Sequence, residues 1–444
     1  MIQRTKEDVL TAIVEKNVKF IRTQFTDTFG TIKSWAIPAE NLEDALNDGV
    51  MFDGSSITGF TRIEESDMTL IPDPNTFCIL PWRPTERGSV ARIIGDVKLP
   101  DGTSFEGDPR YILKKAIKEA EAQGFTMNVG PELEFFLFKL DEKGHPSLEF
   151  TDHGGYFDFA PLDKAQDVRR DIDFALEDMG FNLEASHHEV APSQHEINFK
   201  FDDVLTTADN VITFKYVVKS IAYAKGYYAT FMPKPIYGEN GSGMHSNQSL
   251  SKNGTNAFYD SDSENGLSQT ALYYIGGLLK HIKDFTAVTN PLVNSYKRLV
   301  PGYEAPIYLT WSNLNRSSLI RIPAIRGRGT RVELRCPDPS CNPYLAFALM
   351  LSAGLDGIKN KIDPGEPSNF NIFDVCDETR KEKCIESLPG SLKEAIACMK
   401  ESTFVRSVLG NHVFENYLST KITEWDEYKS QVHKWELDTY FEKY

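Results

Sequence analysis

The sequence lacks the short motifs that identify several nucleotide-binding and metal-binding classes. It contains neither GxGxxG nor GxxxxGK followed by Ser or Thr, which disfavours a P-loop enzyme, a protein kinase and a dinucleotide-binding fold. Its six cysteines are scattered and include no CxxC pair. A zinc–thiolate cluster and a disulfide framework are therefore not expected, and the thiols are predicted to be reduced and mostly buried.

Long apolar runs and an excess of basic residues are also missing. The longest apolar stretch, 345–355, is about half of the ~20 residues that a membrane helix needs. The first 17 residues carry charges throughout and lack the apolar core of a signal peptide. Lys and Arg total 48 against 64 Asp and Glu, and this net charge of −16 repels polyanions. We expect a cytoplasmic protein that binds neither nucleic acid nor a membrane.

What is present is typical of a globular protein with a sizeable core. Hydrophobic residues make up 41% and charged residues 25% of the 444 positions. That length is more than a single domain of ~150 residues usually has. The segment 100–109, PDGTSFEGDP, concentrates turn-forming residues. We therefore place a domain boundary there, with a small domain at 1–103 and a larger one at 104–444.

The two parts differ in their predicted elements. The first reads as compact and strand-rich, with a helix capped by Thr5 and Asp8 and a hairpin formed by 18–25 and 31–37. In the second, strands alternate with helices. We expect a strong strand at 129–140 and helices from Asp108 and Pro109 to about 124, at 165–179, 207–225 and 268–289, and from 342 to about 360.

The last stretch predicts a helix with one aromatic stripe. Trp425, Tyr428, Val432 and Trp435 are three and four residues apart, which places them on one helical face. Such a stripe docks more often on the protein's own core than on a partner subunit. The sequence leaves both arrangements open.

Two glutamates in GPELEFFLF indicate a buried cation. Glu132 and Glu134 are two residues apart in a predicted strand, so their side chains leave the same face, which Phe136 and Phe138 continue. A strand would not bury two unpaired carboxylates beside phenylalanines, because each would cost several kcal/mol. We expect a positive charge beside this pair.

A second acidic pair lies in HHEVAPSQHEINF. Pro192 excludes a helix interior, and a hairpin that turns through APSQ is the natural interpretation. Glu189 and Glu196 are then symmetric about the tip and are predicted to face each other, with Cβ atoms ~5 Å apart. Opposed like charges destabilise a sheet unless a cation lies between them. Two acidic pairs with the same need predict one shared metal site.

Two further residues would complete this site. His245 lies in NGSGMHSNQS, where glycines let the backbone approach a ligand, and Glu333 lies between arginines in TRVELR. Five carboxylates and one imidazole favour Mg²⁺ or Mn²⁺ in two positions over zinc. The alternatives are a structural histidine and solvated acidic strands. His187, His188 and His195 stay unassigned.

Arginines gather between 297 and 335. Eight basic residues, seven of them arginine, stand there against two acidic ones, a local balance of +6. Arginine favours bidentate binding of phosphate or carboxylate, although pairing with acidic neighbours of the same chain is an alternative. Carboxylate-bound divalent cations beside arginines are the layout of phosphoryl transfer.

Seven ordered segments between residues 51 and 344 resemble the signatures of bacterial type I glutamine synthetase: MFDGSSI, GPELEFF, HHEVAPSQHE, NGSGMH, NSYKRLVPGYEAP, NRS with RIP, and RVELRCPDPSCNPY. The resemblance implies an α+β fold, with a small β-grasp-like N-terminal domain. Its large catalytic domain would be a curved, mainly antiparallel sheet, an open barrel, flanked by helices. The resemblance also implies a homo-oligomer, a dodecamer of two stacked hexameric rings with an active site at each subunit boundary.

The activity that the resemblance implies is ATP-dependent ligation of ammonium to the γ-carboxylate of L-glutamate. The reaction would pass through γ-glutamyl phosphate and give L-glutamine, ADP and phosphate. Two divalent ions, Mg²⁺ or Mn²⁺, would be held by Glu134, Glu189 and Glu196 and by Glu132, His245 and Glu333. Asp53 would take a proton from ammonium in the neighbouring subunit's site, and Glu304 would belong to a flap over the intermediate. As bare features, Asp53 is a turn residue and Glu304 a loop residue.

The resemblance assigns further residues to the substrates. Glutamate and the transferring phosphoryl group would be held by Arg298, Arg316, Arg335, Asn240 and Gly241, with Arg316 counted as catalytic. The nucleotide would be bound by Arg321, Arg331, Ser249 and Glu184. Surface ion pairing is the alternative for Arg331 and Glu184.

Regulation is expected to follow the shorter family branch. The longer branch has a modifiable tyrosine where this chain has Phe373 in NIFDVCDE, so adenylylation is not expected. Glutamine feedback and protein partners, including a regulatory transcription factor, are expected instead. Arg62 is the candidate regulatory residue, with a solvated surface arginine as the alternative. Cys336 and Cys341 have no functional explanation.

Two other functions remain as alternatives. One is a related γ-glutamyl-amine ligase, which the complete Asp53 and Glu304 motifs disfavour because a bulky amine needs no ammonium pocket. The other is a non-catalytic sensor of glutamine or nucleotide, which the complete set of metal ligands disfavours.

Overall fold

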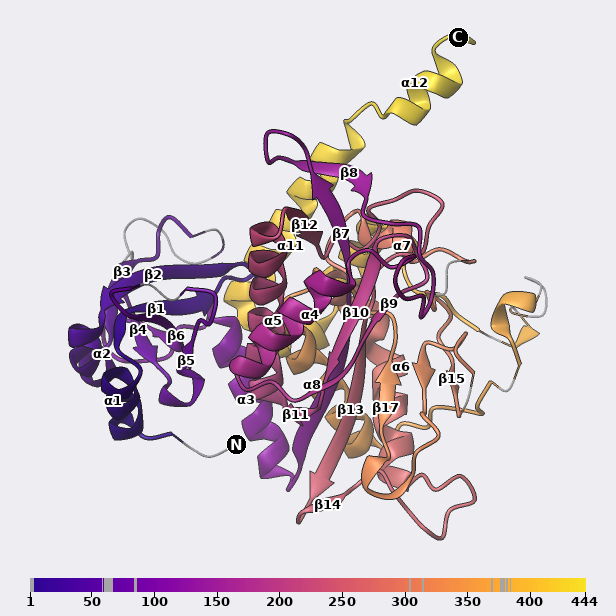
Figure 1. The fold of residues 1–444 in the computed structure, drawn as a ribbon. Coiled ribbons are helices and arrows are strands. Elements are labelled where there is room, and N and C mark those ends of the chain that lie inside the picture. Colours follow the sequence, from indigo (N-terminus) through magenta and orange to yellow (C-terminus); the bar gives the residue numbers. More distant parts are fainter. Residues whose placement is uncertain are drawn as a thin grey trace.

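The computed structural model describes most of the chain. The described residues are 4–57, 59, 67–83, 86–302, 305–313, 315–368, 370–375, 380, 382–383 and 385–444. Arg62 and Glu304 lie outside them. Two sheets and the helices packed on them form the described structure (Figure 1). None of the helices in the ranges above is both long and apolar enough to cross a membrane.

The first sheet lies in the N-terminal part of the chain and has six strands. In spatial order these are β2 (Ile32–Pro38), β1 (Val18–Thr26), β6 (Ser89–Lys98), β4 (Asp67–Pro72) and β3 (Val50–Asp53), with β5 (Cys78–Ile79) paired to β6. The predicted hairpin is confirmed as β1 and β2, whereas β1 and β6 run parallel. The helices α1 (Lys6–Glu15), with the predicted Thr5 cap, and α2 (Leu42–Asp48) bury Val9 and Leu42 beside Ile21.

The second sheet has eleven strands, of which the 15-residue β7 (Thr126–Leu140) is the longest. The order along its main path is β15 (Trp311–Ser312), β16 (Ile320–Arg321), β17 (Val332–Leu334), β13 (Met244–Lys252), β7, β10 (Gln194–Phe199) and β9 (Leu183–His188). Off this path, β7 also pairs with β8 (Pro146–Phe150), β11 (Asp202–Asp203) and β12 (Tyr227–Thr230), and β13 pairs with β14 (Thr255–Asn256). Only the short β15–β16 pairing is parallel among the described pairs of this sheet, as the predicted mainly antiparallel sheet requires.

Helices cover one face of this sheet. The other described helices are α3 (Pro109–Ala122), α4 (Gln166–Asp178), α5 (Val204–Ala224), α6 (Gln269–Thr289), α7 (Ser295–Arg298), α8 (Pro343–Asn360), α10 (Leu392–Glu401), α11 (Thr403–Lys429) and α12 (Lys434–Tyr440). The described 3-10 turns are at Ala39–Asn41, Pro74–Thr76, Gly327–Gly329 and Ile372–Asp374. α3 and α5 contact β7, and α8 packs on α3, α5 and α6 (Figure 1). The five helices predicted between residues 108 and 360 are each confirmed to within three residues.

The alternation of β7 separates a core face from a polar face. Leu133, Phe135 and Leu137 point into the main core, which they share with the buried face of α5. Glu132 and Glu134 leave the opposite face, as predicted. The alternation of apolar and acidic residues along β7 therefore predicts which face of the sheet carries the carboxylates.

The C-terminal prediction was wrong in part. The single aromatic stripe is interrupted, because α11 ends at Lys429 and a capping box of His433 and Glu436 starts α12 as a new helix. Trp425 packs on the main core, but Val432 and Trp435 are 68% and 64% exposed. Figure 1 shows α12 projecting from the body of the molecule. The stripe beyond Lys429 therefore does not dock on the core of its own chain.

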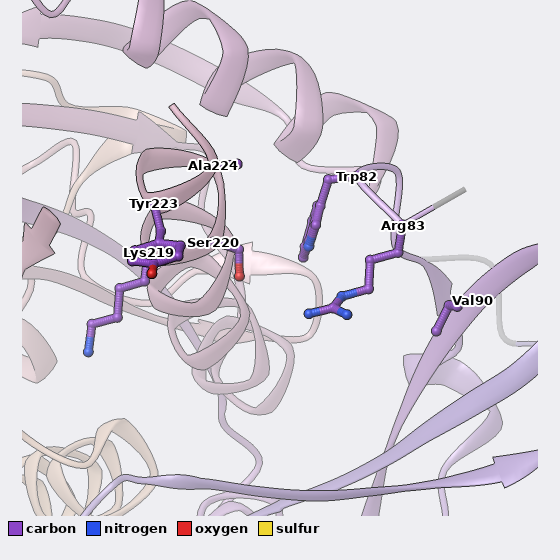
Figure 2. Close-up of a pocket in the computed structure, with 7 residues that line it drawn as sticks. All are labelled: Trp82, Arg83, Val90, Lys219, Ser220, Tyr223 and Ala224. Atoms are coloured by element: carbon purple, nitrogen blue, oxygen red, sulfur yellow. The ribbon is translucent and has the colours of Figure 1, made fainter. Parts of the chain in front are cut away.

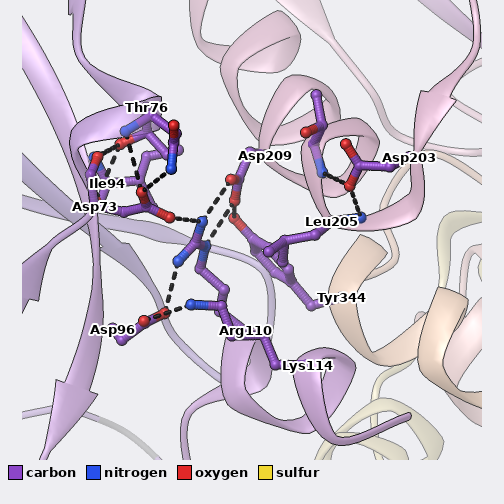
Figure 3. A network of polar contacts seen from close by, with 12 residues as sticks. Asp73, Thr76, Ile94, Asp96, Arg110, Lys114, Asp203, Leu205, Asp209 and Tyr344 are labelled. Carbon is purple, nitrogen blue, oxygen red and sulfur yellow. Dashed lines mark hydrogen bonds and ion pairs between the residues drawn. The ribbon is translucent and has the colours of Figure 1, made fainter. Parts of the chain in front are cut away.

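A buried arginine joins the two parts of the chain (Figure 3). Arg110, at the start of α3, is 3% exposed and donates to Asp73 (2.8 Å) and Asp96 (2.6 Å) beside the first sheet. Its Nε and Nη2 donate to both oxygens of Asp209 on α5, at 3.0 and 2.9 Å. Tyr344 on α8 donates its hydroxyl to the same Asp209 at 2.6 Å. One guanidinium thus neutralises carboxylates from both parts.

Replacing this guanidinium should destabilise the protein strongly. Arg110→Met would leave buried carboxylates without a partner, and breaking such a pair costs about 3–5 kcal/mol. We expect a clearly lower midpoint of thermal unfolding, measured by calorimetry. Lys114→Met is the control, because among the described residues Lys114 pairs with Asp96 alone, at a partly exposed site, and its loss should cost about 1 kcal/mol or less. Equal losses in both variants would contradict the role of Arg110 as the junction.

Candidate active site

The strand registers bring the predicted metal ligands onto one face of the second sheet. Glu134 on β7 lies directly opposite Glu196 on β10. Glu132, two residues earlier, lies opposite His245 on β13. Glu333 on β17 is the cross-strand partner of Asn247, two residues after His245. Four adjacent strands therefore place these side chains in neighbouring positions.

The predicted position of Glu189 was wrong by two residues. The hairpin pairs Glu196 with His187, and the Glu189 N–H donates to the Gln194 carbonyl at 2.8 Å. The tip is offset because Ser193 adopts a left-handed conformation with φ +63°. Glu189 is thus a diagonal neighbour of Glu196 rather than its direct partner. Ligand atoms of His187, Glu189 and Glu196 nevertheless lie within 4.8 Å of one another.

A second ligand set lies beside the first. Ligand atoms of Glu132, His245 and Glu333 are also within 4.8 Å of one another. The Nδ1 of His245 is 3.3 Å from Glu132 Oε2, and Asn247 donates to Glu132 Oε1 at 3.0 Å. Glu134 accepts from the Gln194 amide at 3.1 Å and from the Gly243 N–H at 2.9 Å. Hydrogen bonds to neighbouring side chains and to the main chain thus orient Glu132 and Glu134.

The electrostatics of the face suit a bound cation. Burial and the nearby Glu134 and Glu196 raise the pKa of Glu189 to about 9. Burial, Glu134 and Glu132 also raise the pKa of Glu196. Burial opposes ionisation of Glu132, but the hydrogen bond and charge of His245 lower its pKa to about 2. Crowded carboxylate oxygens with one imidazole in each ligand set fit hard divalent cations such as Mg²⁺ or Mn²⁺.

A polar hollow adjoins these carboxylates. Its lining includes Glu134, Glu189, Gln194, His245 and four residues that were predicted for glutamate: Asn240, Gly241, Arg298 and Arg335. Arg298 is 3% exposed and donates to the carbonyls of Cys336 (2.7 Å) and Arg335 (3.2 Å). A Cβ at position 241 would clash with the main-chain carbonyl oxygen of Pro233, so NGSGMH needs glycine at that point.

The other predicted arginines make contacts within the chain. Arg321 Nε is 2.7 Å from Glu333 Oε2, and Arg335 Nε donates to Glu333 Oε1 at 3.2 Å. Arg331 Nε donates to Asn247 Oδ1 at 2.9 Å. Arg316 is exposed. The alternative of intramolecular ion pairing therefore holds for Arg321 and Arg335, even though both border the carboxylate face.

Three predicted site residues lie outside this cluster. Asp53 ends β3 in the first sheet, which Figure 1 shows well apart from β10, β13 and β17. It is exposed, and the Ser55 hydroxyl and N–H, the latter at 2.8 Å, lower the pKa of its carboxyl. Glu184 is exposed on β9. Ser249 shares the face of His245, four residues farther along β13. Arg62 and Glu304 lie outside the described residues.

The sequence interpretation missed several side chains at the site. Gln194 and Asn247 are each two residues from a predicted ligand, so strand alternation could have identified them. His187 faces Glu196 across the hairpin. Tyr156, in the loop between β8 and α4, hydrogen-bonds Arg316 and stacks on Phe157 at 4.0 Å. A loop tyrosine has no periodic signal that would predict this position.

A wider hollow of about 620 Å³ lies elsewhere and lacks the same chemistry (Figure 2). The residues that line it are Trp82, Arg83, Val90, Lys219, Ser220, Tyr223 and Ala224. No carboxylate is among these lining residues, so they offer no set of metal ligands. The donor chemistry, rather than the size of the hollow, identifies the carboxylate face as the candidate active site.

The fold and site together define a class: a two-part enzyme fold whose open antiparallel sheet carries paired divalent-metal ligand sets beside arginines. The family model "Glutamine synthetase, beta-Grasp domain" matches residues 17–100, and "Glutamine synthetase, catalytic domain" matches residues 106–440. The chain belongs to the glutamine synthetase family. The predicted fold, an N-terminal β-grasp part followed by a catalytic part with a curved sheet and flanking helices, is confirmed.

Relatives match along nearly the whole chain. A glutamine synthetase of Methanosarcina mazei is 74% identical over 436 residues, which cover 98% of this chain and 97% of that protein. One of Clostridium saccharobutylicum is 59% identical over 444 residues and 100% of both chains. Among solved structures, a Plasmodium falciparum glutamine synthetase is 29% identical with a TM-score of 0.87, and a GmaS/ADP complex is 34% identical with a TM-score of 0.89. Both cover 98% of this chain and 99% of theirs.

Neutralising Glu189 should stabilise the metal-free protein. Its pKa of about 9 in the folded chain lies above the ordinary 4.5, so the folded state binds more protons between these values. Stability of the metal-free parent therefore falls as pH rises toward 9. We expect Glu189→Gln to melt above the parent in EDTA, by a margin that grows from pH 5.5 to 8.5.

The same variant should respond weakly to metal. We expect its Mn²⁺-induced rise in melting temperature to be roughly half the parent's or less. Glu149→Gln is the control, because Glu149 is an exposed residue of β8 paired with Lys139. A Glu189→Gln protein that melts like the parent both in EDTA and in Mn²⁺ would contradict the metal site.

Proposed function

We propose that this chain catalyses ATP-dependent ligation of ammonium to the γ-carboxylate of L-glutamate, giving L-glutamine, ADP and phosphate. The observation that carries the proposal is the row of carboxylates around His245 that borders an arginine-lined hollow. Family membership over both parts of the chain and full-length relatives named glutamine synthetase support it.

Two metal positions are proposed, and the two convergent groups of ligand atoms support them, with Glu134 added to the first because it lies opposite Glu196. Glu134, Glu189 and Glu196 would hold one ion, and Glu132, His245 and Glu333 the other. The donor set favours Mg²⁺ or Mn²⁺. Bound divalent ions would neutralise and orient the phosphate oxygens of ATP. Arg321 and Arg335 already contact Glu333, so they border the second position.

The residues of the hollow suit glutamate. A carboxylate is a poor electrophile. In the proposed reaction, an oxygen of the glutamate γ-carboxylate therefore first takes the γ-phosphoryl group of ATP, which gives γ-glutamyl phosphate and releases ADP. Arg298 and Arg335 would bind the anionic substrate, with Asn240 and Gly241 holding the amino acid. Arg316, at the exposed rim, would stabilise the charge of the transferring phosphoryl group.

The nucleotide would lie on the same sheet farther along β13. Ser249 shares the face of His245, and Arg331 contacts Asn247 on that face. Arg321 and Glu184 complete the proposed nucleotide set. Of these, the exposed Glu184 on β9 has the least structural support.

Ammonium needs negative charge near the intermediate and a group that accepts its proton. Asp53 is proposed for this role, and Glu304 for a flap that excludes water from the acyl phosphate. Since Asp53 lies far from the carboxylate face of its own chain, a second copy must supply it. A homo-oligomer follows, and we propose the dodecamer of two hexameric rings, built from domains at 1–103 and 104–444.

Regulation is proposed to be that of the shorter type I branch. Phe373 lacks the hydroxyl that adenylylation would need. Glutamine feedback that involves Arg62, and a regulatory transcription factor as protein partner, are the proposed controls.

A coupled assay for phosphate release tests the reaction. Release should require glutamate, ATP, Mg²⁺ and ammonium together, and glutamine should form in equal amount. Putrescine in place of ammonium should give little phosphate release, because the proposed pocket at Asp53 and Glu304 suits the small ammonium ion rather than a bulky amine. Activity only with putrescine would indicate the γ-glutamyl-amine ligase, and nucleotide binding without turnover would indicate the sensor.

Mixed oligomers test whether two chains share each site. Asp53→Asn and Glu189→Gln should each be inactive alone, because every site then lacks one group. Co-assembled in equal amounts, they should recover about a quarter of the parent activity, the fraction of sites with both residues intact in a head-to-tail ring. Simple mixing without reassembly is the control, and no recovery after co-assembly would contradict a shared site.

A further inference from the structure

A buried cluster lies directly behind the hairpin that carries Glu189. Asp152, His188 and His195 are 3%, 0% and 0% exposed, and their ligand atoms lie within 4.8 Å of one another. His188 and His195 face each other across the hairpin and stack edge to face at 5.0 Å. Neither the proposed reaction nor the metal positions use these three residues.

Their hydrogen bonds do not suit a third metal. Both nitrogens of His188 already face acceptors: Asp152 Oδ1 at 2.9 Å and the Glu189 carbonyl at 2.6 Å. Arg169, which is paired with Asp163, places its guanidinium 3.0 Å from His195 Nδ1. A fixed cation beside the cluster repels a metal ion, so hydrogen bonding is its function.

Asp152 accepts hydrogen bonds from several segments around this cluster. Its Oδ1 accepts from His188 and from the backbone N–H of Ser193 at 3.2 Å and of Gly154 at 3.3 Å. Its Oδ2 accepts from the N–H of Lys164 at 3.2 Å. One buried carboxylate thus connects the loop after β8 with the left-handed tip of the hairpin.

His188 carries this connection to the site. Its Nδ1 donates to the main chain of Glu189 itself, and its own carbonyl accepts from the Phe157 N–H at 3.1 Å. Phe157 is the ring on which Tyr156 stacks. His188 therefore contacts the main chain of Glu189 and also the main chain of Phe157, the residue that follows Tyr156 in the loop.

We propose that Asp152 and His188 are positioning residues that fix the Glu189 carboxylate toward the metal through the hydrogen bond from His188 to the Glu189 carbonyl. This inference rests on the proposed function, because it takes Glu189 as a metal ligand. Residues that orient ligands in this way typically change metal affinity by about 10–100-fold when removed.

The two amide replacements of His188 separate positioning from support of the fold. Gln places its amide nitrogen near Nε2 and keeps a donor toward Asp152, whereas Asn places it near Nδ1 and keeps a donor toward Glu189. Mn²⁺ affinity is measured by electron paramagnetic resonance on the full oligomer without substrates. We expect His188→Gln to weaken binding by about 10-fold or more, and His188→Asn by only a few-fold.

A matched pair elsewhere provides the control. His281 on α6 donates to Asp356 on α8 at 2.7 Å. This is also a histidine–aspartate hydrogen bond, but it lies outside the candidate active site. His281→Gln should lower the melting temperature and leave Mn²⁺ affinity unchanged. Equal Mn²⁺ affinity in the parent and both His188 variants, with only the melting temperature altered, would overturn the proposal. Equal weakening in Gln and Asn variants would overturn it as well.

A milder perturbation covers the case in which the His188 variants do not fold. A Cβ at Gly154 would lie 3.0 Å from His188 Nε2, whereas one at Gly155 would make an ordinary 3.6 Å contact with Asp158. We expect Gly154→Ala to weaken Mn²⁺ binding several-fold and Gly155→Ala to leave it unchanged. Identical affinities in the two alanine variants would overturn the proposal.

Measurements of Mn²⁺ binding and glutamine formation by the parent protein separate the proposed function from the proposed positioning role. A parent that binds Mn²⁺ but forms no glutamine rejects the proposed function while the comparison of variants still decides the positioning role. A parent that forms glutamine, with variants that bind Mn²⁺ equally well, rejects the positioning role alone.

Discussion

Repulsion between carboxylates on one face of a sheet is the constraint on which the rest of the structure depends. Glu134, Glu189 and Glu196 converge at partly or fully buried positions, where like charges are stable only with a proton or a cation between them. The opposite face of β7 contributes Leu133, Phe135 and Leu137 to the main core. The fold thus uses its hydrophobic core to hold an arrangement of charge that would not persist on an unsupported strand.

Much of this arrangement could be predicted from the sequence, because a strand exposes alternate residues on the same face. That rule placed Glu132 and Glu134 correctly, and with the strand around Glu196 it located the face on which the site lies. The same rule failed at Glu189, since the register of the hairpin depends on the left-handed Ser193 and no pattern of hydrophobicity encodes that conformation. A two-residue shift left Glu189 on the correct face but opposite a different neighbour.

Other features depend on contacts between distant segments and could not be predicted. Arg298 is held by carbonyls of the segment around Cys336, and Arg110 reaches carboxylates in three separate segments of the chain. Tyr156 lies in a loop that hydrogen-bonds Asp152 through Gly154 and the His188 carbonyl through Phe157. At the C-terminus, the spacing of aromatic residues predicted one helix that continues past Lys429. In the structure α11 ends at Lys429, and the capping box of His433 and Glu436 starts a second helix.

The raised pKa of Glu189 has a consequence for calorimetry. With a pKa of about 9, this carboxyl would release a proton to the solvent on binding a divalent ion as proposed. The heat measured on titrating the ion then includes the ionisation enthalpy of whichever buffer receives that proton. Titrations in Tris and in phosphate would give different apparent enthalpies for one and the same event, and their difference would count the protons exchanged.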